Sequence, residues 1–218
     1  MYIYQVERDL LKRFIKKYAV HMGGKMLDAG SGPAKKYAGL FQKVTQYMTL
    51  DINPEFHTDI VGSVDAIPAD ESSFDGIVCT QVLGDILRPE SAIKEFYRIL
   101  KPRGMILLTE GFMNELHSEP RDFWRFTPYG LRALFEENKF DVIAVECIGG
   151  IFSVAAQMFT KYAINSLHLY DHKLLGKIFS KIFFVFGKSA ILLDNILQSD
   201  AGKKSALNVL VVARKRTV

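Results

Sequence analysis

The chain begins with apolar residues at helical spacing and continues as short apolar runs separated by glycine, proline and polar turns. Leu10, Phe14 and Tyr18 fall on one face of a predicted amphipathic helix, which we expect to end at Gly23 and Gly24. The uninterrupted apolar runs that follow are typical of strands covered on both faces. The predicted strands are residues 25–29, 47–51, 59–62, 74–80, 105–109, 140–147 and 207–213.

Helical patterns lie between these predicted strands, at residues 34–42, 89–100 and 127–138. The first strand, a glycine turn, the first of these helices and the second strand together predict a parallel βαβ crossover. The alternation of strands and helices along the chain indicates an α/β fold. We expect a doubly wound, mostly parallel Rossmann-like sheet with helices on both faces.

Residues 148–206 interrupt the alternation, and we expect them to form an extra helical insertion of two or three helices before the last strand. Between residues 173 and 193, lysines cluster on one stripe of a helix and the opposite positions are Leu, Ile, Phe or Val. This pattern fits a helix lying on an anionic membrane surface, and it also fits a homodimer interface or an extended core, since broad apolar faces are usually packed. The sequence leaves these alternatives open. The lysines are Lys173, Lys177, Lys181 and Lys188.

Length and composition favour one globular domain over residues 1–218. A chain of 218 residues suits a single α/β domain, and 49% hydrophobic residues exclude disorder for most of it. The net charge of +4 is too small to argue for a nucleic-acid partner. The expected parts are an N-terminal helix (1–22), a ligand-binding core (23–147), the helical insertion (148–206), and a last strand with a tail (207–218).

The sequence predicts a cytoplasmic protein without a spanning helix. No stretch of about 20 uncharged apolar residues is present. Charged residues such as Glu7 and Arg8 stand where a leader would have its apolar segment. Both cysteines, Cys79 and Cys147, lie in apolar runs, which fits a reducing compartment. If the insertion binds lipid, we expect the protein at the inner face of the membrane.

A glycine turn follows the first predicted strand. In the run from Asp28 to Gly32 (Asp-Ala-Gly-Ser-Gly), the glycines allow a sharp turn and a close approach to a ligand. Asp51 ends the next predicted strand, where a carboxylate can accept both ribose hydroxyls of an adenosine. The turn and the acidic residue together predict a site for an adenosine-containing ligand.

Local charge distinguishes between adenosine ligands. A dinucleotide site requires a third glycine at position 35, which is Lys35 here. Asp28 would repel a pyrophosphate but attract an amino group. These charges favour a ligand with an ammonium and a sulfonium over a nicotinamide dinucleotide.

Several linked runs resemble the motifs of class I S-adenosylmethionine-dependent methyltransferases, and they are most similar to the type 11 group. Residues 26–32 resemble the first motif of this family, and residues 50–52 resemble the second. Residues 62–68 and 73–78 resemble the third and fourth motifs. Residues 99–105 resemble the turn before the fifth strand, so the resemblance covers roughly residues 20–147. It implies S-adenosyl-L-methionine as the cofactor.

The resemblance also implies which residues bind this cofactor. Two positions depart from the family pattern. Ser63 stands where relatives often have an Asp that contacts the adenine, so Asp65 is the candidate for this contact instead. After the fourth strand, Gly84-Asp85 stands where many relatives have a Glu-His pair. The expected cofactor-binding residues are Asp28, Ala29, Gly30, Ser31, Gly32, Asp51, Ile52, Ser63, Val64, Asp65 and Gln81.

The loop after the fifth strand, residues 110–126, is the predicted acceptor site, because ligands of open α/β sheets lie beyond the carboxyl ends of the strands. His117 is the candidate general base, with a purely positioning or contact role as the alternative. Asp122, Trp124 and Arg125 are the candidate substrate-binding residues. Asp122 and Arg125, three residues apart, are alternatively a local ion pair that shapes the loop.

The sequence therefore predicts methyl transfer to a small-molecule, glycan or lipid-linked acceptor, at oxygen. No His, Asp and Glu residues have metal-ligand spacing, so no metal is expected. Residues 80–83 (Thr-Gln-Val-Leu) lack the Asn/Asp-Pro-Pro-aromatic loop of base-modifying relatives, and no nucleic-acid partner is expected. A nicotinamide-dependent oxidoreductase and a non-catalytic, membrane-associated cofactor-binding module are the alternatives.

Overall fold

The computed structural model describes residues 1–197, 202 and 204–217. The chain divides into two compact units. The first unit consists of Met1–Arg13, Phe112–Glu115 and Cys147–Asn208. The second consists of Phe14–Gly111, Leu116–Glu146 and Val209–Val218. The single domain over residues 1–218 stays a prediction.

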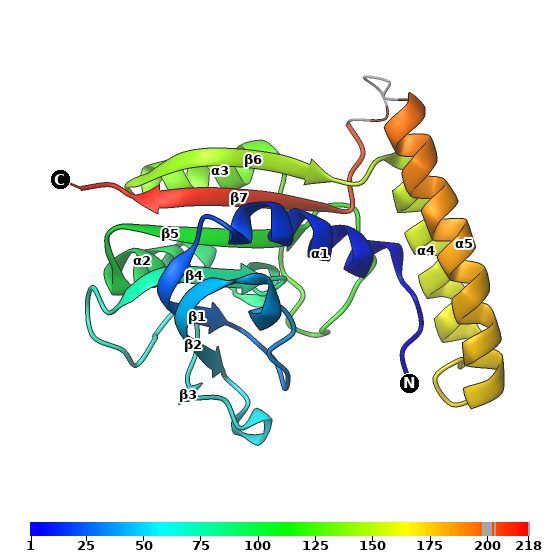
Figure 1. Cartoon of the computed structure of the whole chain (residues 1–218), viewed down its shortest axis with the longest axis horizontal. Coiled ribbons are helices and arrows are strands. Elements are labelled where there is room, and N and C mark those ends of the chain that lie inside the picture. Colours follow the sequence, from blue (N-terminus) through cyan, green and yellow to red (C-terminus); the bar gives the residue numbers. More distant parts are fainter. Residues whose placement is uncertain (198–201, 203, 218) are drawn as a thin grey trace. The chain divides into compact units, whose positions relative to one another are not determined.

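A seven-stranded sheet in the order β3-β2-β1-β4-β5-β7-β6 forms the frame of the second unit (Figure 1). β1 pairs in parallel with β2 and β4, β2 with β3, and β4 with β5. Figure 1 shows β7 running opposite to β6. The predicted doubly wound, mostly parallel sheet is confirmed. Its strands are β1 (Gly23–Ala29), β2 (Lys43–Asp51), β3 (Ile60–Val61), β4 (Phe74–Thr80), β5 (Leu100–Gly111), β6 (Phe140–Ile148) and β7 (Asn208–Lys215).

Helices cover both faces of this sheet, as predicted. Figure 1 shows the C-terminal half of α1 (Val6–Ala19) in front of the sheet, and α2 (Pro89–Ile99) and α3 (Pro128–Glu137) behind it. Each helix buries one apolar stripe, which includes Ile15 of α1, Phe96 of α2 and Phe135 of α3. Both α2 and α3 begin with proline, which lacks the N–H group that a helix leaves unpaired at its first turn.

The predicted helix over residues 34–42 is wrong. Only a short 3-10 turn, η1 (Ala38–Leu40), forms between β1 and β2. Phe41 is the one fully buried residue of this segment, so no apolar stripe is available to stabilise a helix. Gly39 lowers the helical propensity further, by about 1 kcal/mol.

The two glycines after α1 begin β1 instead of ending the helix, so β1 is longer than predicted. A Cβ on Gly23 would lie 2.8 Å from the Lys43 carbonyl oxygen, and only glycine allows this approach of the two strands. β2 begins at Lys43, before the predicted residue 47, because its first residues pair with these two glycines. β5 is also longer than the predicted 105–109, since Leu100 already pairs with Phe74 of β4.

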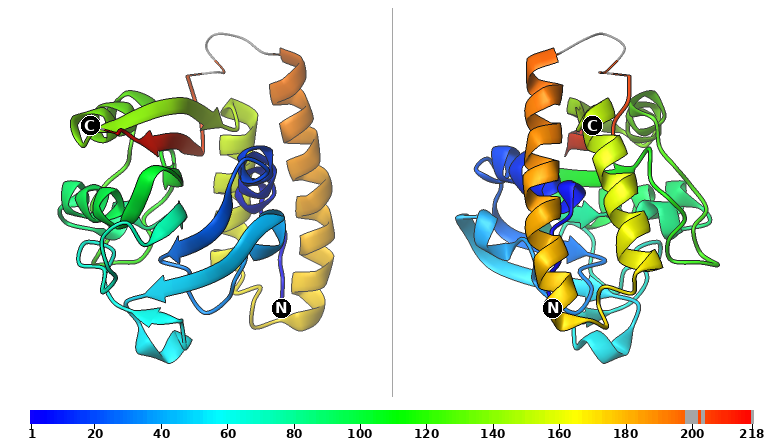
Figure 2. Two further views of the ribbon diagram at one scale, coloured as in Figure 1. Left: turned by 60° about the vertical axis from the view of Figure 1, so that its left-hand side comes forward. Right: turned by 90° about the vertical axis from the view of Figure 1, so that its right-hand side faces the viewer.

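The first unit contains a helical hairpin, α4 (Ile151–Ser166) and α5 (Lys173–Leu197), which lie side by side in both views of Figure 2. The predicted insertion before the last strand is confirmed, and α4 and α5 are the two long helices among its described residues. Residues 198–201 and 203 of the insertion and residue 218 of the tail lie outside the described part of the chain. Within the described residues, no helix has the length and apolar character needed to cross a membrane.

Candidate active site

The glycine turn lies at the carboxyl end of β1, in the second unit. Gly30 and Gly32 have positive φ angles of 74° and 64°, which glycine adopts without strain. The N–H groups of Gly30 and Ser31 both donate to the Leu50 carbonyl oxygen, at 2.8 and 3.0 Å. A Cβ on Gly30 would lie 2.3 Å from Val82 Cγ2, whereas a Cβ on Gly32 would meet only Lys36 Nζ at 4.0 Å. The turn is therefore packed on the β4 side and open beyond Gly32.

Asp51 lies directly beside this turn, at the end of β2. Its Oδ2 accepts a hydrogen bond from the Gly32 N–H at 2.9 Å, and its Oδ1 accepts one from the Asn53 N–H at 3.0 Å. Ile52 follows with an exposed side chain. The carboxylate thus holds the turn in place from the position where the sequence predicts a ribose contact.

Asp28 is almost completely buried near the end of β1. It is 2% exposed, and its Oδ2 accepts a 2.7 Å hydrogen bond from the Tyr47 hydroxyl. Burial raises the pKa of the Asp28 carboxyl to about 6, and the hydrogen bond from Tyr47 opposes only part of this effect. The predicted contact of Asp28 with an amino group stays a prediction. Tyr47 was not identified from the sequence, because nothing local to β2 indicates a partner on β1.

The segment after β3 lies next to Asp51. The Gly62 N–H donates to the Asp51 carbonyl oxygen at 3.0 Å, and the Ser63 hydroxyl donates to Asp65. Val64 is buried and Asp65 is exposed. These predicted cofactor-binding residues therefore gather with the glycine turn at the carboxyl ends of β1, β2 and β3, as expected for parallel strands.

Glu110, at the end of β5, organises the turn after β4. Its Oε1 accepts hydrogen bonds from the N–H groups of Val82 and Leu83, at 3.0 and 2.7 Å, and its Oε2 accepts one from Gly84 at 3.1 Å. Burial raises the pKa of the Glu110 carboxyl to about 7, although the three N–H groups oppose this effect. From the sequence, Glu110 is only the first residue of the predicted acceptor loop and has no assigned role. The sequence feature that could have indicated a role is a carboxyl group directly after a predicted apolar strand.

Gln81 begins this turn with a positive φ of 57°, and its N–H donates to the Thr109 carbonyl oxygen at 2.8 Å. The next residue, Val82, is the one that packs against Gly30. The short 3-10 helix η3 (Leu83–Asp85) then follows. The turn after β4 therefore connects the glycine turn to Asp85.

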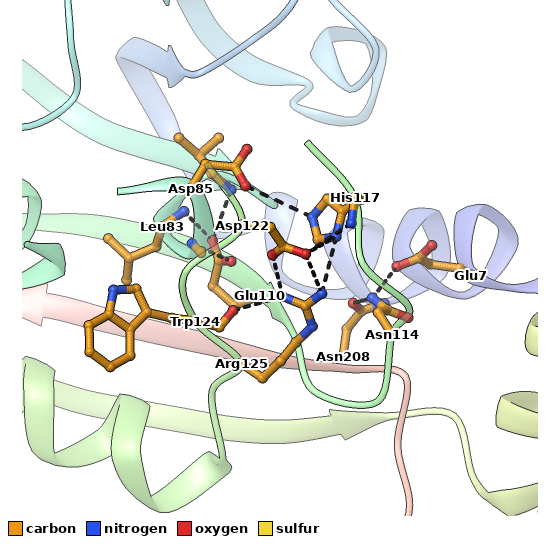
Figure 3. Close-up of polar contacts among 12 residues, drawn as sticks. Glu7, Leu83, Asp85, Glu110, Asn114, His117, Asp122, Trp124, Arg125 and Asn208 are labelled. Carbon is orange, nitrogen blue, oxygen red and sulfur yellow. Dashed lines mark hydrogen bonds and ion pairs between the residues drawn. The ribbon is translucent and has the colours of Figure 1, made fainter. Parts of the chain in front are cut away.

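Asp85 and Asp122 flank the imidazole of His117 (Figure 3). The Nε2 atom of His117 lies 4.0 Å from Asp85 Oδ1, and its Nδ1 atom lies 3.5 Å from Asp122 Oδ2. The His117 backbone N–H also donates to Asp122 Oδ2, at 2.9 Å. Burial raises the pKa of the Asp85 carboxyl, and the nearby His117 opposes this effect. Asp85 was named in the sequence only as a departure from a motif.

Asp122 and Arg125 form an ion pair, which confirms the alternative that they shape the loop. Both guanidinium Nη atoms donate to the Asp122 carboxylate, with Nη2 at 2.8 Å from Oδ2. Arg125 holds the pKa of the Asp122 carboxyl well below its ordinary value. The Asp122 side chain is only 2% exposed. Its predicted contact with the acceptor stays a prediction, and the structure shows it facing His117 and Arg125.

Trp124 contributes its backbone to this arrangement. Its N–H donates to the Gly84 carbonyl oxygen at 3.2 Å, while Figure 3 shows the indole pointing away from His117. The side chain is half-exposed, so a contact with an acceptor stays a prediction.

Asp85, His117 and Asp122 also form a group that can hold a metal ion, with one potential ligand atom from each within 4.8 Å of the others. Sequence spacing did not indicate this group, because the fold brings two separate loops together. That no metal is bound stays a prediction. However, Arg125 already donates to both oxygens of Asp122. A cation at this position would lie next to the guanidinium group.

Comparisons with known proteins agree with this geometry. A family described as a methyltransferase domain matches residues 27–108. The comparison with curated proteins finds no match.

Three solved structures show the range of similar proteins. The [4+2]-cyclase SpnF has a TM-score of 0.63 at 17% identity, over 96% of this chain and 81% of that one. A putative sarcosine dimethylglycine methyltransferase from Galdieria sulphuraria has a TM-score of 0.61 at 16% identity, over 96% and 84%. Phosphoethanolamine N-methyltransferase 2 from Haemonchus contortus, in complex with S-adenosyl-L-methionine, has a TM-score of 0.59 at 18% identity, over 96% and 53%. At these identities the likeness shows the shared fold.

Proposed function

We propose that this chain, a methyltransferase by its matching domain over residues 27–108 and by the fold it shares with S-adenosylmethionine-dependent methyltransferases, methylates a hydroxyl group with His117 as the general base. The proposed acceptor is a small molecule or a glycan- or lipid-linked group. The observation that supports this proposal is the imidazole of His117 lying between two carboxylates, Asp85 and Asp122.

The residues of the second unit fit S-adenosylmethionine. The space beyond Gly32 is open, and the Asp51 carboxylate lies at its edge. The methionine and ribose parts would be held by residues 28–32 and 51–52, and the adenine by residues 63–65, with Gln81 beside them. When bound, the cofactor would supply a methyl group attached to a positively charged sulfur. The leaving group would be the neutral thioether, adenosylhomocysteine.

A hydroxyl acceptor must lose its proton for methylation to be completed, and a histidine is suited to accept it near neutral pH. We assign proton acceptance to Nε2 of His117, because its Nδ1 lies 3.5 Å from Asp122 Oδ2, and an Nδ1–H that faces this carboxylate leaves the lone pair of Nε2 for the incoming proton. The resulting imidazolium would lie between the carboxylates of Asp85 and Asp122, which favour its positive charge.

Asp122 has a positioning role in this proposal. Its carboxylate accepts the backbone N–H of His117 and both Nη atoms of Arg125, so it joins the beginning and the end of the loop. Glu110 positions the opposite side of the site, because the turn it binds carries Asp85.

The test is a screen for adenosylhomocysteine release with hydroxyl-bearing small molecules, glycans and lipid-linked sugars. With an acceptor found, His117→Ala should lower turnover by about 10²–10⁴-fold while cofactor affinity stays unchanged. Turnover of the parent should fall as the solution is acidified, because only a neutral imidazole accepts a proton. His21→Ala, at an exposed position of the second unit, is the matched control.

Two results would contradict the proposal. If His117→Ala turns over within a few-fold of the parent with the same pH profile, positioning alone accounts for the rate and no base is involved. If the protein binds the cofactor but releases no adenosylhomocysteine with any acceptor class, the non-catalytic module is favoured instead.

A further inference from the structure

The α4–α5 hairpin of the first unit carries large apolar side chains at solvent-exposed positions. On α5 these residues recur every three or four positions, so they share one face of the helix, and the buried residues Phe183, Gly187 and Ala190 lie on the other. The exposed fractions in this apolar face range from 47% to 66%. Its main members are Leu175, Ile178, Ile182, Val185, Leu192 and Ile196.

The apolar surface continues onto α4. Met158, Phe159 and Tyr162 are exposed there, and the ring of Phe159 lies 5.9 Å from that of Phe186 on α5. Both helices of the hairpin therefore contribute to one surface, which lies entirely within the first unit. Such a broad exposed apolar surface marks an interaction site.

Lysines lie along one edge of this surface. Lys173, Lys177 and Lys181 are exposed and four residues apart, so they follow a single line on α5 beside the apolar face. The other two lysines of the hairpin are paired within the first unit. Lys161 lies 2.7 Å from Glu115, and Lys188 lies 2.7 Å from Asp9.

We propose that this hairpin surface binds the face of an anionic lipid bilayer. The apolar side chains would enter the boundary between headgroups and acyl chains, and the lysines would reach the anionic headgroups. The hairpin would lie along the bilayer, because no helix of the described residues is suited to cross it. The proposal is independent of the acceptor and of the role of His117.

Charge favours a bilayer over a second copy of the chain. Residues 151–197 contain five lysines but only two acidic residues, Asp171 and Asp194. The Asp194 carboxylate already accepts hydrogen bonds from the N–H groups of Gly150, Phe152 and Ser153. A second hairpin would thus bring one exposed carboxylate against three exposed lysines, whereas an anionic bilayer offers a negative group to each of them.

The experiment is flotation of the full chain with vesicles of phosphatidylcholine that contain about one third phosphatidylglycerol, and with vesicles of phosphatidylcholine alone. The parent should float with the anionic vesicles and much less with the neutral ones, and high salt should weaken binding. K173Q/K177Q/K181Q should bind the anionic vesicles about 100-fold more weakly, since each lysine near the surface contributes about fivefold. K12Q/K43Q/K94Q, at three exposed lysines elsewhere, should bind like the parent.

A second variant tests the apolar face. I178Q/I182Q/V185Q replaces side chains that are exposed, so it opens no cavity in the hairpin. It should lose vesicle binding while it keeps the circular dichroism spectrum and the cofactor affinity of the parent. V20Q/I143Q changes exposed apolar residues of the second unit and should have no effect.

Three results would overturn the proposal: no flotation at low salt, equal binding to neutral and anionic vesicles, or binding unchanged in both hairpin variants. If the parent instead forms a dimer without lipid that I178Q/I182Q/V185Q abolishes, and does not float, the surface is an interface between copies of this chain.

Discussion

Glu110 is the residue on which the turn after β4 depends. Its carboxyl group is fully enclosed and binds three successive backbone N–H groups, those of Val82, Leu83 and Gly84. An amide side chain at this position offers only one acceptor oxygen, so it could not accept hydrogen bonds from the N–H groups on both sides of the carboxyl group. The position of Asp85, and with it one side of the His117 site, follows from this contact.

Glu110→Gln should change how stability depends on pH. Burial raises the Glu110 pKa from 4.5 to about 7, so between these pH values the folded chain binds a proton that the unfolded chain lacks. Stability from this group is therefore fully present below about pH 4.5 and is lost as pH rises toward 7. The variant should lack this dependence. It should also be about 1–3 kcal/mol less stable at low pH, because its amide N–H₂ faces the Gly84 N–H.

Urea unfolding of both proteins at several pH values between 4.5 and 7 measures this difference. Asp28, whose pKa is raised to about 6 by burial, contributes in the same direction, but equally in both proteins. Identical pH dependence in parent and variant would show that Glu110 does not titrate in this range.

Asp51→Ala should weaken binding of S-adenosylmethionine by about 1.5–3 kcal/mol, or roughly 10- to 150-fold. The variant removes the carboxylate beside the glycine turn, together with its bonds to Gly32 and Asn53. Calorimetry measures the affinity. Glu55→Ala removes an exposed carboxylate nearby and serves as the control. An unchanged affinity in Asp51→Ala would remove Asp51 from the cofactor site.

Removal of divalent cations should leave turnover unchanged. Asp85, His117 and Asp122 are close enough to hold a metal, but Arg125 donates to both oxygens of Asp122 and supplies positive charge at that position. Turnover should therefore be equal before and after dialysis against a chelator. A loss that added Mg²⁺ or Mn²⁺ restores would identify the cluster as a metal centre and His117 as a ligand.

At the scale of elements, the two helices of the hairpin are joined by a cap: a side chain of α5 accepts hydrogen bonds from the N-terminus of α4. The side chain of Asp194 on α5 accepts N–H groups of Gly150, Phe152 and Ser153 at the start of α4, at 2.9–3.1 Å. These groups have no partner within α4, since the first turn of a helix leaves its N–H groups unpaired. The negative charge also matches the positive end of the helix dipole.

Asp194→Ala should therefore loosen the start of α4 and cost about 0.5–2 kcal/mol. Hydrogen exchange should become faster at residues 150–153, while exchange in α2 and α3 stays unchanged. Asp171→Ala, in the turn between α4 and α5, removes an exposed carboxylate of the same hairpin and is the control. Equal protection of residues 150–153 in the parent and in Asp194→Ala would contradict the capping role.

At the scale of the whole molecule, ligand binding should distinguish a methyltransferase from a nicotinamide-dependent enzyme. A ligand that binds only the folded chain stabilises it by about 2.7 kcal/mol at 100 times its Kd. Adenosylhomocysteine should therefore raise the melting temperature of the full chain, and NAD should not, because Asp28 and Lys35 replace the features of a pyrophosphate site. A larger rise with NAD than with adenosylhomocysteine would contradict the assigned cofactor.

The sequence by itself determined the elements whose signals are local. The strand at 74–80 has its predicted bounds, and the helix predicted at 127–138 forms at Pro128–Glu137 with Thr127 as its cap. Hydrophobic period, capping residues and glycine turns act between residues close in the chain, so they can be recognised without the fold. The same holds for the motif around Gly30 and Gly32, which indicated the cofactor.

Only the tertiary structure decided what depends on contacts between distant segments. The helix predicted at 34–42 is absent because no neighbouring element buries it, and the sequence contains no signal for that. The parallel pairing of β4 with β5 places Glu110 beside the turn that carries Asp85. The loop fold then brings Asp85 to His117. Each side chain was visible in the sequence, but their contacts are set by strand register and packing, which no local pattern encodes.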